Sequence, residues 1–354
     1  MEKLNCISEN KNILSIQSEI GNSKIIVGES LSSVSEYLPA GKKTVIITDS
    51  TVKDLYGQTF PEACLTIEIP QGENNKVLHT LDLVFEKMTE AEIDRTSFIL
   101  GIGGGIVCDV AGFAASVYMR GIEFGFVSTT LLSQVDASTG GKNGVNFNGY
   151  KNMIGTFNLP EFVICDQELL KTLPRHELIS GMAEVVKHGA IADPGFFRFI
   201  EENAHNVLMY DIEVLEKIVY ESVVIKSGIV KKDVKENGVR KILNFGHTIG
   251  HAVEKFTGMQ HGMAISTGMT LAAEISAARG LIEKQEADRI PALLQKLGLP
   301  VKLPIGPEIL LEAIRRDKKR EGDHIKFVLL DKIGSACIEK ISLEELKSIL
   351  NDLY

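Results

Sequence analysis

Two histidines spaced four residues apart, His247 and His251, are the side chains in this sequence best placed to do chemistry. Both rings fall on one face if the segment is helical. His261 follows, so three of the eight histidines lie within fifteen residues. Glycines beside each histidine allow another backbone or a ligand to approach closely. The pattern fits a metal or anion site, and it also fits a pair of hydrogen-bonded or solvent-facing histidines.

A carboxylate that could complete a ligand set is Glu184, in the small and apolar stretch 181–188. Lys187 follows one helical turn later, so Glu184 alone is typical of a partly buried ion pair. Together with His247 and His261 it would form a set of two histidines and one carboxylate. Three protein ligands leave coordination positions open, as a catalytic zinc site requires. Iron accepts the same ligands, so the set does not identify the metal.

A glycine-rich segment, 101–105, follows an apolar strand pattern and precedes an apolar helix pattern. Glycines there permit a tight turn and let backbone N–H groups approach a pyrophosphate at a helix N-terminus. A plain strand-to-helix turn is the alternative. Asp49 and the segment 70–76 also fall at carboxyl ends of expected strands, where open α/β sheets bind ligands. This agreement favours a dinucleotide, with Asp49 accepting hydrogen bonds from ribose hydroxyls.

The segment 128–155 is rich in polar residues and glycine, which favours a binding loop over a simple connection. Lys142, Lys151 and Asn152 could neutralise and hydrogen-bond a phosphate or carboxylate, although such lysines can also be merely solvated. A basic run at 315–320 has the same two interpretations: a solvated helix face, or the source of one lysine for an anionic substrate.

The order of the expected elements indicates an α/β fold. Strand patterns at 24–27, 44–49, 65–69, 97–102, 124–127 and 162–165 alternate with helix patterns, including 77–91 and 107–117. This alternation predicts a Rossmann-like parallel sheet. After about residue 173 the periodicity becomes helical, as in 212–230, 264–278 and 343–350, with one clear strand at 326–330. We therefore expect an NAD-binding α/β domain, 1–173, and a mostly helical metal- and substrate-binding domain, 174–354.

Composition limits the possible classes of function. The 354 residues are 44% hydrophobic and 24% charged, which is ordinary for a globular enzyme. A net charge of -9 argues against nucleic acid or an anionic membrane as the main partner. The five cysteines are scattered and never spaced as CxxC, so we expect reduced thiols and a cytoplasmic protein. The first residues lack the apolar stretch of a signal peptide, and no apolar run approaches the roughly 20 residues that span a bilayer.

The motifs taken together resemble those of the 3-dehydroquinate synthase family over nearly the whole chain. The matching segments are PQGENNK (70–76), GGGIVCDVAGF (103–113), YMRGI (118–122), TTLLSQVDAS (129–138), GGK (140–142), KNMIG (151–155), GMAEVVKHG (181–189), ENGVRKILNFGHTIGH (236–251), HG (261–262) and DKK (317–319). The resemblance implies a homodimeric lyase that uses NAD and a divalent metal, zinc or cobalt. It converts 3-deoxy-D-arabino-heptulosonate 7-phosphate into 3-dehydroquinate and phosphate in the shikimate pathway of aromatic amino acid biosynthesis.

The resemblance also implies a role for each matching residue. The expected metal ligands are Glu184, His247 and His261. The expected NAD contacts are Asp49, Glu73, Lys76, Gly103, Gly104, Gly105, Asp109, Thr129 and Thr130, with Lys142, Lys151, Leu169 and Thr172 bordering the cofactor. The expected substrate-pocket residues are Asp136, Lys142, Lys187, Lys226, Arg240, Asn244 and His251. The substrate phosphate would be held by Lys142, Asn152, His251 and either Lys318 or Lys319, and by Arg120 acting across the dimer interface.

The implied reaction explains why these residue types occur together. Metal and NAD oxidise one hydroxyl, and the new carbonyl acidifies the neighbouring C–H, so that phosphate leaves by β-elimination. NADH returns the hydride, and ring opening followed by an intramolecular aldol step closes the carbocycle. Lysines that fix the phosphate and carboxylate orient one flexible molecule for all these steps. His251 would be a proton shuttle near the oxidised hydroxyl.

Several positions depart from the family's usual pattern without removing an expected ligand. Met263 stands where many members have Glu, Phe147 follows Asn146 where many have His, Ser128 replaces a common Pro, and Cys108 replaces a common Gly. Two other enzymes remain alternatives: a different sugar-phosphate cyclase, and a metal- and NAD-dependent polyol dehydrogenase. A non-catalytic NAD-binding regulator would be expected to have a broken ligand set.

Overall fold

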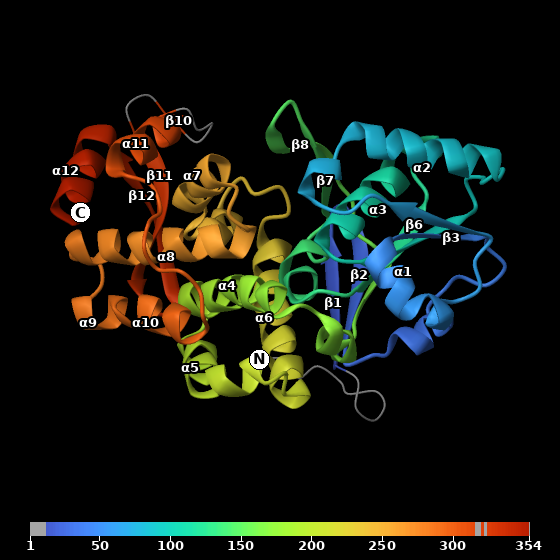
Figure 1. The fold of residues 1–354 in the computed structure, drawn as a ribbon, viewed down its shortest axis with the longest axis horizontal. Helices are drawn as coiled ribbons and strands as arrows, with labels where there is room; N and C mark the ends of the chain where they lie inside the picture. The colour runs from blue at the N-terminus through green and yellow to red at the C-terminus, as the bar shows by residue number, and fades with distance from the viewer. Residues whose placement is uncertain (1–11, 316–319, 322–323, 354) are drawn as a thin grey trace. The chain divides into compact units, whose positions relative to one another are not determined.

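The computed structural model describes residues 12–315, 320–321 and 324–353. The chain divides into two compact units, Met1–Leu173 (unit 1) and Pro174–Tyr354 (unit 2) (Figure 1). Unit 1 is an α/β unit built on a mainly parallel sheet, and unit 2 is mostly helical. The predicted fold class is therefore confirmed.

The sheet of unit 1 has seven strands in the order β1-β2-β9-β6-β5-β3-β4. The strands are β1 (Asn12–Ser18), β2 (Gly21–Val27), β3 (Thr44–Asp49), β4 (Leu65–Ile69), β5 (Phe98–Gly103), β6 (Glu123–Ser128) and β9 (Phe162–Cys165). β1 and β2 pair in an antiparallel manner, and every other pairing in this sheet is parallel. β5 and β9 are buried along their whole length, as expected of strands covered on both faces.

Helices of unit 1 follow the strands and cover the sheet. They are α1 (Ser50–Tyr56), α2 (Leu78–Glu90) and α3 (Gly105–Val117). Short turns of 3-10 helix are η1 (Leu31–Glu36), η2 (Gly57–Thr59), η3 (Glu73–Asn75), η4 (Tyr118–Arg120) and η6 (Gln167–Thr172). The apolar helix α3 packs against β5 and β6, so the end of β5 and the start of α3 are held rigidly together. A buried cluster around Ile46, Leu100, Val127 and Ile164 forms the core on one side of the sheet.

The polar segment 128–155 is more regular than the predicted binding loop. It contains a π-helical turn, η5 (Ser133–Ala137), and an antiparallel hairpin of β7 (Lys142–Phe147) and β8 (Tyr150–Phe157). Gly144 and Gly155 face each other across the hairpin, and a Cβ on Gly155 would lie 2.2 Å from the Asn143 carbonyl oxygen. The glycines that suggested a loop therefore allow two strands to approach closely.

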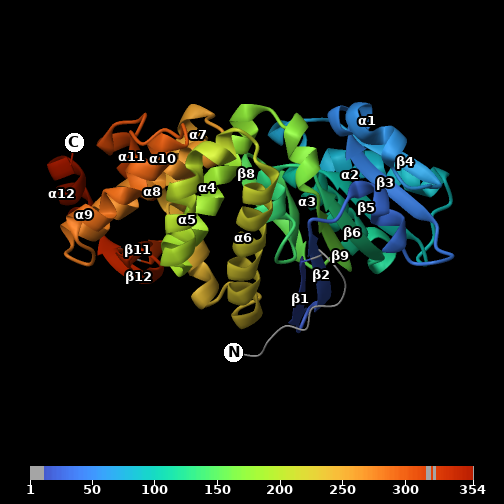
Figure 2. The same cartoon turned by 90° about the horizontal axis from the view of Figure 1, so that it is seen from below.

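Unit 2 is a bundle in which α8 (His261–Ala278) lies at the centre, against α4 (Arg175–Ala192) and α7 (His247–Thr257). The helices α4, α5 (Pro194–Leu208) and α6 (Ile212–Lys232) lie side by side (Figure 2). The remaining elements are η7 (Val239–Asn244), α9 (Lys284–Ala287), α10 (Arg289–Lys296), α11 (Pro307–Arg315) and α12 (Leu343–Leu353). None of the helices in the described ranges combines the length and apolarity needed to cross a membrane.

The predicted late strand, 326–330, is confirmed as part of β11, but two further strands were not predicted, because unit 2 contains a three-stranded antiparallel sheet in the order β10-β11-β12. The strands are β10 (Arg320–Glu321), β11 (His324–Lys332) and β12 (Ser335–Ser342). β11 is largely buried against α8, where the Leu330 N–H donates to Ser276 Oγ at 3.0 Å. β12 is half exposed, so its sequence lacks the apolar run that identified β11.

Candidate active site

The centre of the candidate site in unit 2 is Glu184, a carboxylate on α4 with no exposed surface. One oxygen, Oε2, forms an ion pair with the Lys187 ammonium one turn along the same helix. The other, Oε1, accepts no hydrogen bond from the residues described, although it is buried. Buried polar atoms without partners are costly, so Oε1 indicates a place for a cation.

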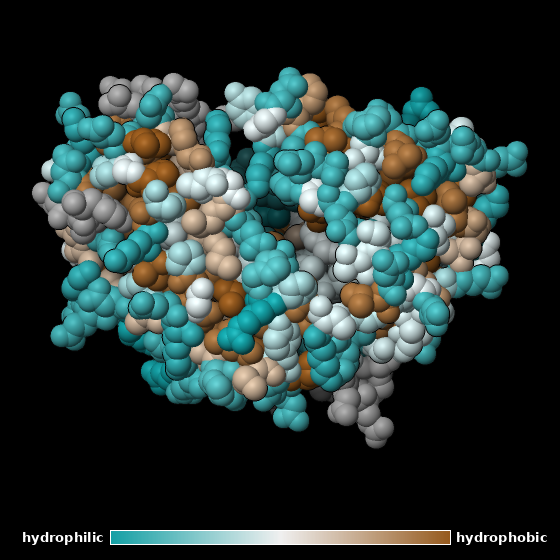
Figure 3. All heavy atoms as spheres, in the orientation of Figure 1, coloured by the Kyte–Doolittle hydropathy of each residue, from teal (hydrophilic) through white to brown (hydrophobic). Residues whose placement is uncertain are grey.

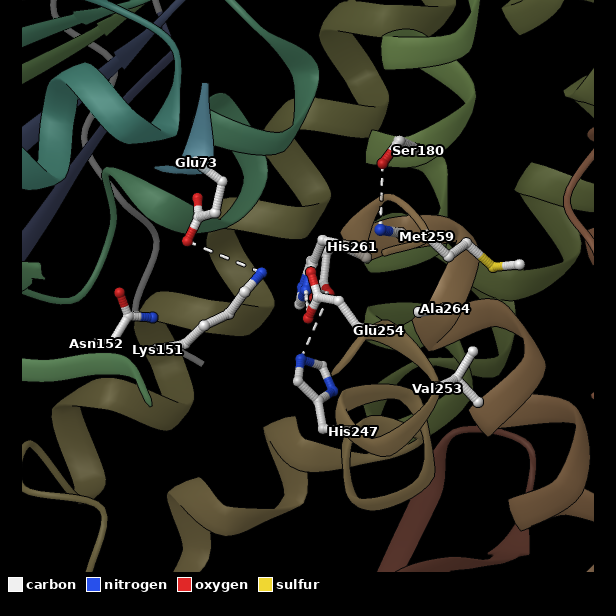
Figure 4. A network of polar contacts seen from close by, with 12 residues as sticks. Glu73, Lys151, Asn152, Ser180, His247, Val253, Glu254, Met259, His261 and Ala264 are labelled. Atoms are coloured by element: carbon white, nitrogen blue, oxygen red, sulfur yellow. Dashed lines mark hydrogen bonds and ion pairs between the residues drawn. The ribbon is translucent and has the colours of Figure 1, made fainter. Parts of the chain in front are cut away.

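Two histidines face that oxygen from the first residues of two helices. The Nε2 atoms of His247 on α7 and His261 on α8 lie 3.5 and 3.3 Å from Glu184 Oε1. Figure 4 shows the two histidine side chains close together. Nitrogen and oxygen ligands lie about 2.0–2.2 Å from a tetrahedral zinc ion, so two ligand atoms are about 3.3–3.6 Å apart. The three side chains are spaced as ligands of one metal ion, and the partial exposure of His261, 30%, leaves a side open to substrate.

The two rings differ in protonation, and only His247 has a free lone pair in the absence of a metal. Burial holds the pKa of His247 well below its ordinary value, against the opposing effect of Glu184, so this ring is neutral. Its Nδ1 lies 3.1 Å from the Phe245 carbonyl oxygen, which can only accept, so Nδ1 carries the hydrogen and Nε2 the lone pair. Burial opposes the charge of His261, but the carboxylates of Glu184 and Glu254 raise its pKa to about 9. Without a metal, a proton on His261 is stabilised by Glu184.

The pKa of Glu184 itself lies well below its ordinary value. Burial works against ionisation, and the positive charge of Lys187, followed by the His247 and His261 rings, outweighs it. The carboxylate is therefore ionised and can act as an anionic metal ligand.

Glycines bring these helices close enough for the three ligands to meet. A Cβ on Gly262 would lie 1.9 Å from the Ser180 carbonyl oxygen of α4, and the Gly262 N–H donates to Ser180 Oγ at 3.2 Å. The start of α8 therefore rests directly on α4, next to Glu184. We expected the glycines beside the histidines to permit close approach of a backbone or a ligand. This is confirmed, and at Gly262 the approaching group is the backbone of helix α4.

Further expected substrate residues of unit 2 lie on elements that pack against one another. Lys187 on α4, Lys226 on α6 and Arg240 on η7 are 1%, 5% and 2% exposed, and α4, α6 and η7 are in mutual contact. Three such buried cations in one region suit an anionic ligand. Asn244 Nδ2 donates to Glu236 Oε1 at 2.5 Å, and the exposed His251 ring lies 5.3 Å from that of His247 between centroids.

In unit 1, the expected cofactor residues gather at the carboxyl ends of neighbouring strands. Asp49 ends β3, Gly103 ends β5, and Thr129 and Thr130 follow β6. From β3 the chain adds β4 on one side and β5 on the other, so the order of strands reverses between β3 and β5. Open α/β sheets bind ligands at such a reversal, which places the candidate dinucleotide site here.

The start of α3 has the features of a phosphate-binding turn. Gly104 occupies its N-cap position, and no side chain of the described residues caps the first turn, so its N–H groups remain available to an anion. A Cβ on Gly103 would lie 2.5 Å from Val107 side-chain atoms, which explains the need for glycine there. Asp49 Oδ1 meanwhile accepts from the Val52 N–H at 3.1 Å and from Gln71 Nε2 at 3.3 Å.

A polar network connects the segment after β4 to the β7–β8 hairpin. Lys76, 5% exposed, forms an ion pair with Asp109 on α3 and donates to Asn152 Oδ1 at 2.7 Å. Asn146 on β7 donates to Glu73 Oε1 at 2.8 Å and accepts from the Asn152 N–H at 2.9 Å. Lys76 donates to the amide oxygen of Asn152, so the NH₂ group of that amide points away from Lys76 and is available to donate a hydrogen bond.

The other expected residues of unit 1 occupy several positions. Lys151 lies 3.8 Å from Glu73 Oε1 (Figure 4). Thr130 exchanges hydrogen bonds with Ser133, and Tyr56 contacts both Leu169 and Thr172. Asp136 is in η5, Gly105 begins α3, exposed Lys142 begins β7, and exposed Arg120 is in η4. Lys318 and Lys319 lie outside the described residues.

The sequence did not identify two residues that the structure adds to the site. Asn146 is central to the network of unit 1, but nothing in its spacing indicates this. Glu254, on α7 and 8% exposed, lies 3.6 Å from His261 Nδ1 through Oε2. Its position seven residues after His247 places it on the same helix face, and this spacing could have revealed it.

Comparison with known proteins identifies the family. Residues 66–180 match the model of the 3-dehydroquinate synthase N-terminal domain, and residues 181–320 match that of its C-terminal domain. The 3-dehydroquinate synthase of Geobacter sp. (strain M21) is 43% identical over 308 residues, covering 84% of this chain and 85% of that protein. The chain belongs to the 3-dehydroquinate synthase family. The member from Thermodesulfovibrio yellowstonii is 42% identical, covering 88% of this chain and 90% of its own.

Solved structures of other cyclases share the fold of this family member. A 2-deoxy-scyllo-inosose synthase complexed with carbaglucose-6-phosphate, NAD+ and Co2+ has a TM-score of 0.85 at 26% identity, covering 96% of this chain and 100% of its own. The 2-epi-5-epi-valiolone synthase of Streptomyces hygroscopicus, with NAD+ and Zn2+ bound, has a TM-score of 0.85 at 25% identity and covers 99% of each chain.

The close contact at Gly262 gives a direct test of the metal centre. We expect Gly262→Ala to weaken Co2+ binding and to destabilise the fold by about 1–3 kcal/mol, because the methyl group would push α8 away from Ser180 and carry His261 with it. Co2+ titration and thermal unfolding measure the two effects.

The matched control is Gly228→Ala, since Gly228 is exposed on α6 and a Cβ there meets nothing within 4 Å. Alanine is the better helix former by up to about 1 kcal/mol, so this variant should match or exceed the wild-type melting temperature. Unchanged Co2+ affinity in Gly262→Ala would contradict the proposed geometry.

Proposed function

We propose that this protein is a 3-dehydroquinate synthase, which converts 3-deoxy-D-arabino-heptulosonate 7-phosphate into 3-dehydroquinate and phosphate. The observation that carries the proposal is the meeting of Glu184 Oε1 with the Nε2 atoms of His247 and His261 in a chain of this family. The buried cations of unit 2 suit an anionic substrate, and the glycines at the end of β5 in unit 1 suit a dinucleotide.

Glu184, His247 and His261 would hold a divalent cation, zinc or cobalt. Glu184 Oε1, which accepts no hydrogen bond from the described residues, and the spacing of the three ligand atoms fit such an ion. A bound cation would supply Lewis-acid chemistry, lowering the pKa of a substrate hydroxyl. Lys187 holds the other carboxylate oxygen and so keeps Glu184 in one orientation. His251, exposed and beside His247, would take the hydroxyl proton and pass it to water.

The strand ends of unit 1 would hold NAD, which supplies reversible hydride transfer. The uncapped N-terminus of α3 would bind the pyrophosphate through its N–H groups, with Gly103, Gly104 and Gly105 allowing close approach. The other residues that would bind or border the cofactor are Asp49, Glu73, Lys76, Asp109, Thr129, Thr130, Lys142, Lys151, Leu169 and Thr172. The domain boundaries we propose are accordingly 1–173 for NAD binding and 174–354 for metal and substrate binding.

Basic and amide groups would orient the substrate. In unit 1 the Asn152 amide, whose oxygen is held by Lys76, would donate through Nδ2 to a phosphate oxygen, with Lys142 as its cationic neighbour on the hairpin. The phosphate would also be bound by Lys318 or Lys319. In unit 2 the substrate contacts would come from Lys187, Lys226, Arg240, Asn244 and His251, with Asp136 of unit 1 as a further contact. Fixing the two ends of a flexible acid phosphate places its reacting carbons for successive steps.

Sequence similarity favours this substrate over those of related cyclases. Curated 3-dehydroquinate synthases are 40–43% identical to the chain, whereas solved structures of 2-deoxy-scyllo-inosose synthase and 2-epi-5-epi-valiolone synthase are 25–27% identical. A polyol dehydrogenase would not need the buried lysines of unit 2. The described cysteines are free thiols, which supports the reducing cytoplasm as the compartment.

An activity assay tests this proposal. Purified protein with catalytic NAD, Co2+ or Zn2+ and 3-deoxy-D-arabino-heptulosonate 7-phosphate should release phosphate without net accumulation of NADH, because the hydride is returned in each turnover. Phosphate release is measured by a coupled colorimetric assay and NADH by its absorbance. Lasting NADH would indicate a dehydrogenase, and phosphate release only from glucose 6-phosphate or a heptulose phosphate would indicate another cyclase.

We also propose that the protein is a homodimer that uses an apolar surface of unit 1. The β7–β8 hairpin exposes Phe147, Tyr150, Met153 and Phe157, at 42–53% of their surface. The hairpin packs against α3, which ends in the exposed Val117, and Figure 3 shows apolar side chains among polar ones over this part of unit 1. Several large apolar side chains exposed on one hairpin favour an interface with another chain, and a symmetric pair is the commonest form of oligomer.

Arg120 would act on the phosphate bound by the partner. Arg120 is exposed in the turn after α3, where φ is positive at both Met119 (47°) and Arg120 (71°). Non-glycine residues rarely adopt this conformation, and strained turns of this kind cluster at functional sites.

Mixed dimers test the role of Arg120. We expect Arg120→Ala and Glu184→Ala each to lose most activity, and a co-expressed mixture to recover about a quarter of it, since a mixed dimer holds one site with neither change and half of randomly formed dimers are mixed. The specific activity of the unfractionated mixture provides the measurement, and doubly tagged dimers purified from it, all of them mixed, should have about half of the wild-type activity. Absence of recovery in mixed dimers would show that Arg120 acts within its own chain.

A further inference from the structure

The two ring nitrogens of His261 face two different carboxylates. Nε2 lies 3.3 Å from Glu184 Oε1, and Nδ1 lies 3.6 Å from Glu254 Oε2 (Figure 4). Glu254 belongs to the last turns of α7 and is 8% exposed. A carboxylate is seldom buried to this extent without a group that stabilises its charge, and the His261 ring is such a group.

His247 shows how the second nitrogen of a candidate ligand is held. Its Nδ1 lies 3.1 Å from the Phe245 carbonyl oxygen, two residues earlier in the chain, so its ring orientation depends on local backbone. His261 is the first residue of α8, and the acceptor facing its Nδ1 comes from another helix. The orientation of His261 therefore depends on the packing of α7 against α8.

We propose that Glu254 is a positioning residue, which accepts the Nδ1–H of His261 and so presents Nε2 to the metal. A carboxylate on the outer nitrogen of a ligand histidine fixes its tautomer, restrains the ring and increases its basicity. A shift of about 0.5 Å brings the 3.6 Å contact into hydrogen-bond range. The inference rests on the proposed metal site formed by Glu184, His247 and His261.

A different use of the same atoms is a second cation site. Ligand atoms of His251, Glu254 and His261 also lie within 4.8 Å of one another. A second ion there would require both nitrogens of His261 as ligands, which needs a doubly deprotonated ring. The positioning role needs only the ordinary neutral ring, and the number of ions bound per chain separates the two.

Titration with Co2+ alone tests the proposal on full-length protein freed of metal by chelation. We expect one Co2+ per chain in the wild type. Glu254→Ala should weaken binding about 10–100-fold, and Glu254→Gln, which keeps an oxygen acceptor, should lose less. The Co2+ absorption bands should shift in Glu254→Ala. Glu274→Gln is the matched control, because Glu274 is a partly buried carboxylate on α8 outside the site, and its affinity should equal the wild type.

The outcomes separate this inference from the proposed function. Wild-type affinity in Glu254→Ala, with unchanged Co2+ bands, would overturn the positioning role while leaving the metal centre in place. Two Co2+ ions per wild-type chain would overturn it in favour of the second site. Failure of the wild type to bind Co2+ would remove both the metal centre and this inference. If Glu274→Gln lost as much Co2+ affinity as Glu254→Ala, the loss would reflect a general effect of removing a buried charge. That result would contradict a specific positioning role for Glu254.

Discussion

An ionised carboxylate buried in the middle of a helix bundle requires positive charge around it, and Glu184 imposes this requirement on unit 2. Lys187 meets it at one oxygen, and the rings of His247 and His261 face the other. The helices α4 and α8 cannot repack independently, because separating His261 from Glu184 would leave the buried carboxylate without that cation, and moving α7 would remove the His247 ring from the same oxygen. The buried Glu184 carboxylate is stabilised by positive charge, and the same carboxylate oxygen with the two histidine nitrogens forms a position for a metal ion.

Close helix packing makes this arrangement possible. Gly262 lets α8 rest on the Ser180 carbonyl of α4, and a Cβ on Gly268 would lie 2.0 Å from the Gly246 carbonyl oxygen just before α7. The glycines that adjoin the histidines in sequence are thus the contact points between the helices. Helix packing and the positions of the metal ligands depend on the same few glycines. Substituting one of these glycines should therefore change both the stability of the fold and the affinity for the metal.

Local patterns in the sequence were sufficient to predict several elements of the fold. The strands 44–49, 65–69 and 162–165 have the predicted bounds. The first and third are short apolar runs buried in the parallel sheet, and 65–69, at the sheet edge, alternates apolar and polar residues. β12 and the β7–β8 hairpin were missed because their strands are half exposed or rich in polar residues and glycine. Their conformation depends on pairing with a partner strand, which local pattern does not reveal.

In the candidate site, too, some residues could be predicted from the sequence and others depend on contacts made only in the folded chain. Residue type and motif order brought Glu184, His247 and His261 together as expected ligands, although His247 lies 63 positions after Glu184 in the sequence. The side chains that hold the site in place, Asn146 and Glu254, became visible only in three dimensions. Their partners are set by how β7 meets the segment after β4 and how α7 packs on α8. The sequence therefore indicates which side chains react or bind a metal more readily than it indicates which residues hold those side chains in place.

The role of Glu184 as a metal ligand is tested most directly by comparing metal and NAD binding in the wild type, Glu184→Ala and the isosteric Glu184→Gln. Isothermal titration with Co2+ and with NAD measures both affinities, and circular dichroism checks the fold. We expect both variants to stay folded and bind NAD like the wild type, with Co2+ binding abolished in Glu184→Ala and strongly weakened in Glu184→Gln. Wild-type Co2+ affinity in folded Glu184→Ala, or loss of NAD affinity with Co2+ retained, would contradict the account.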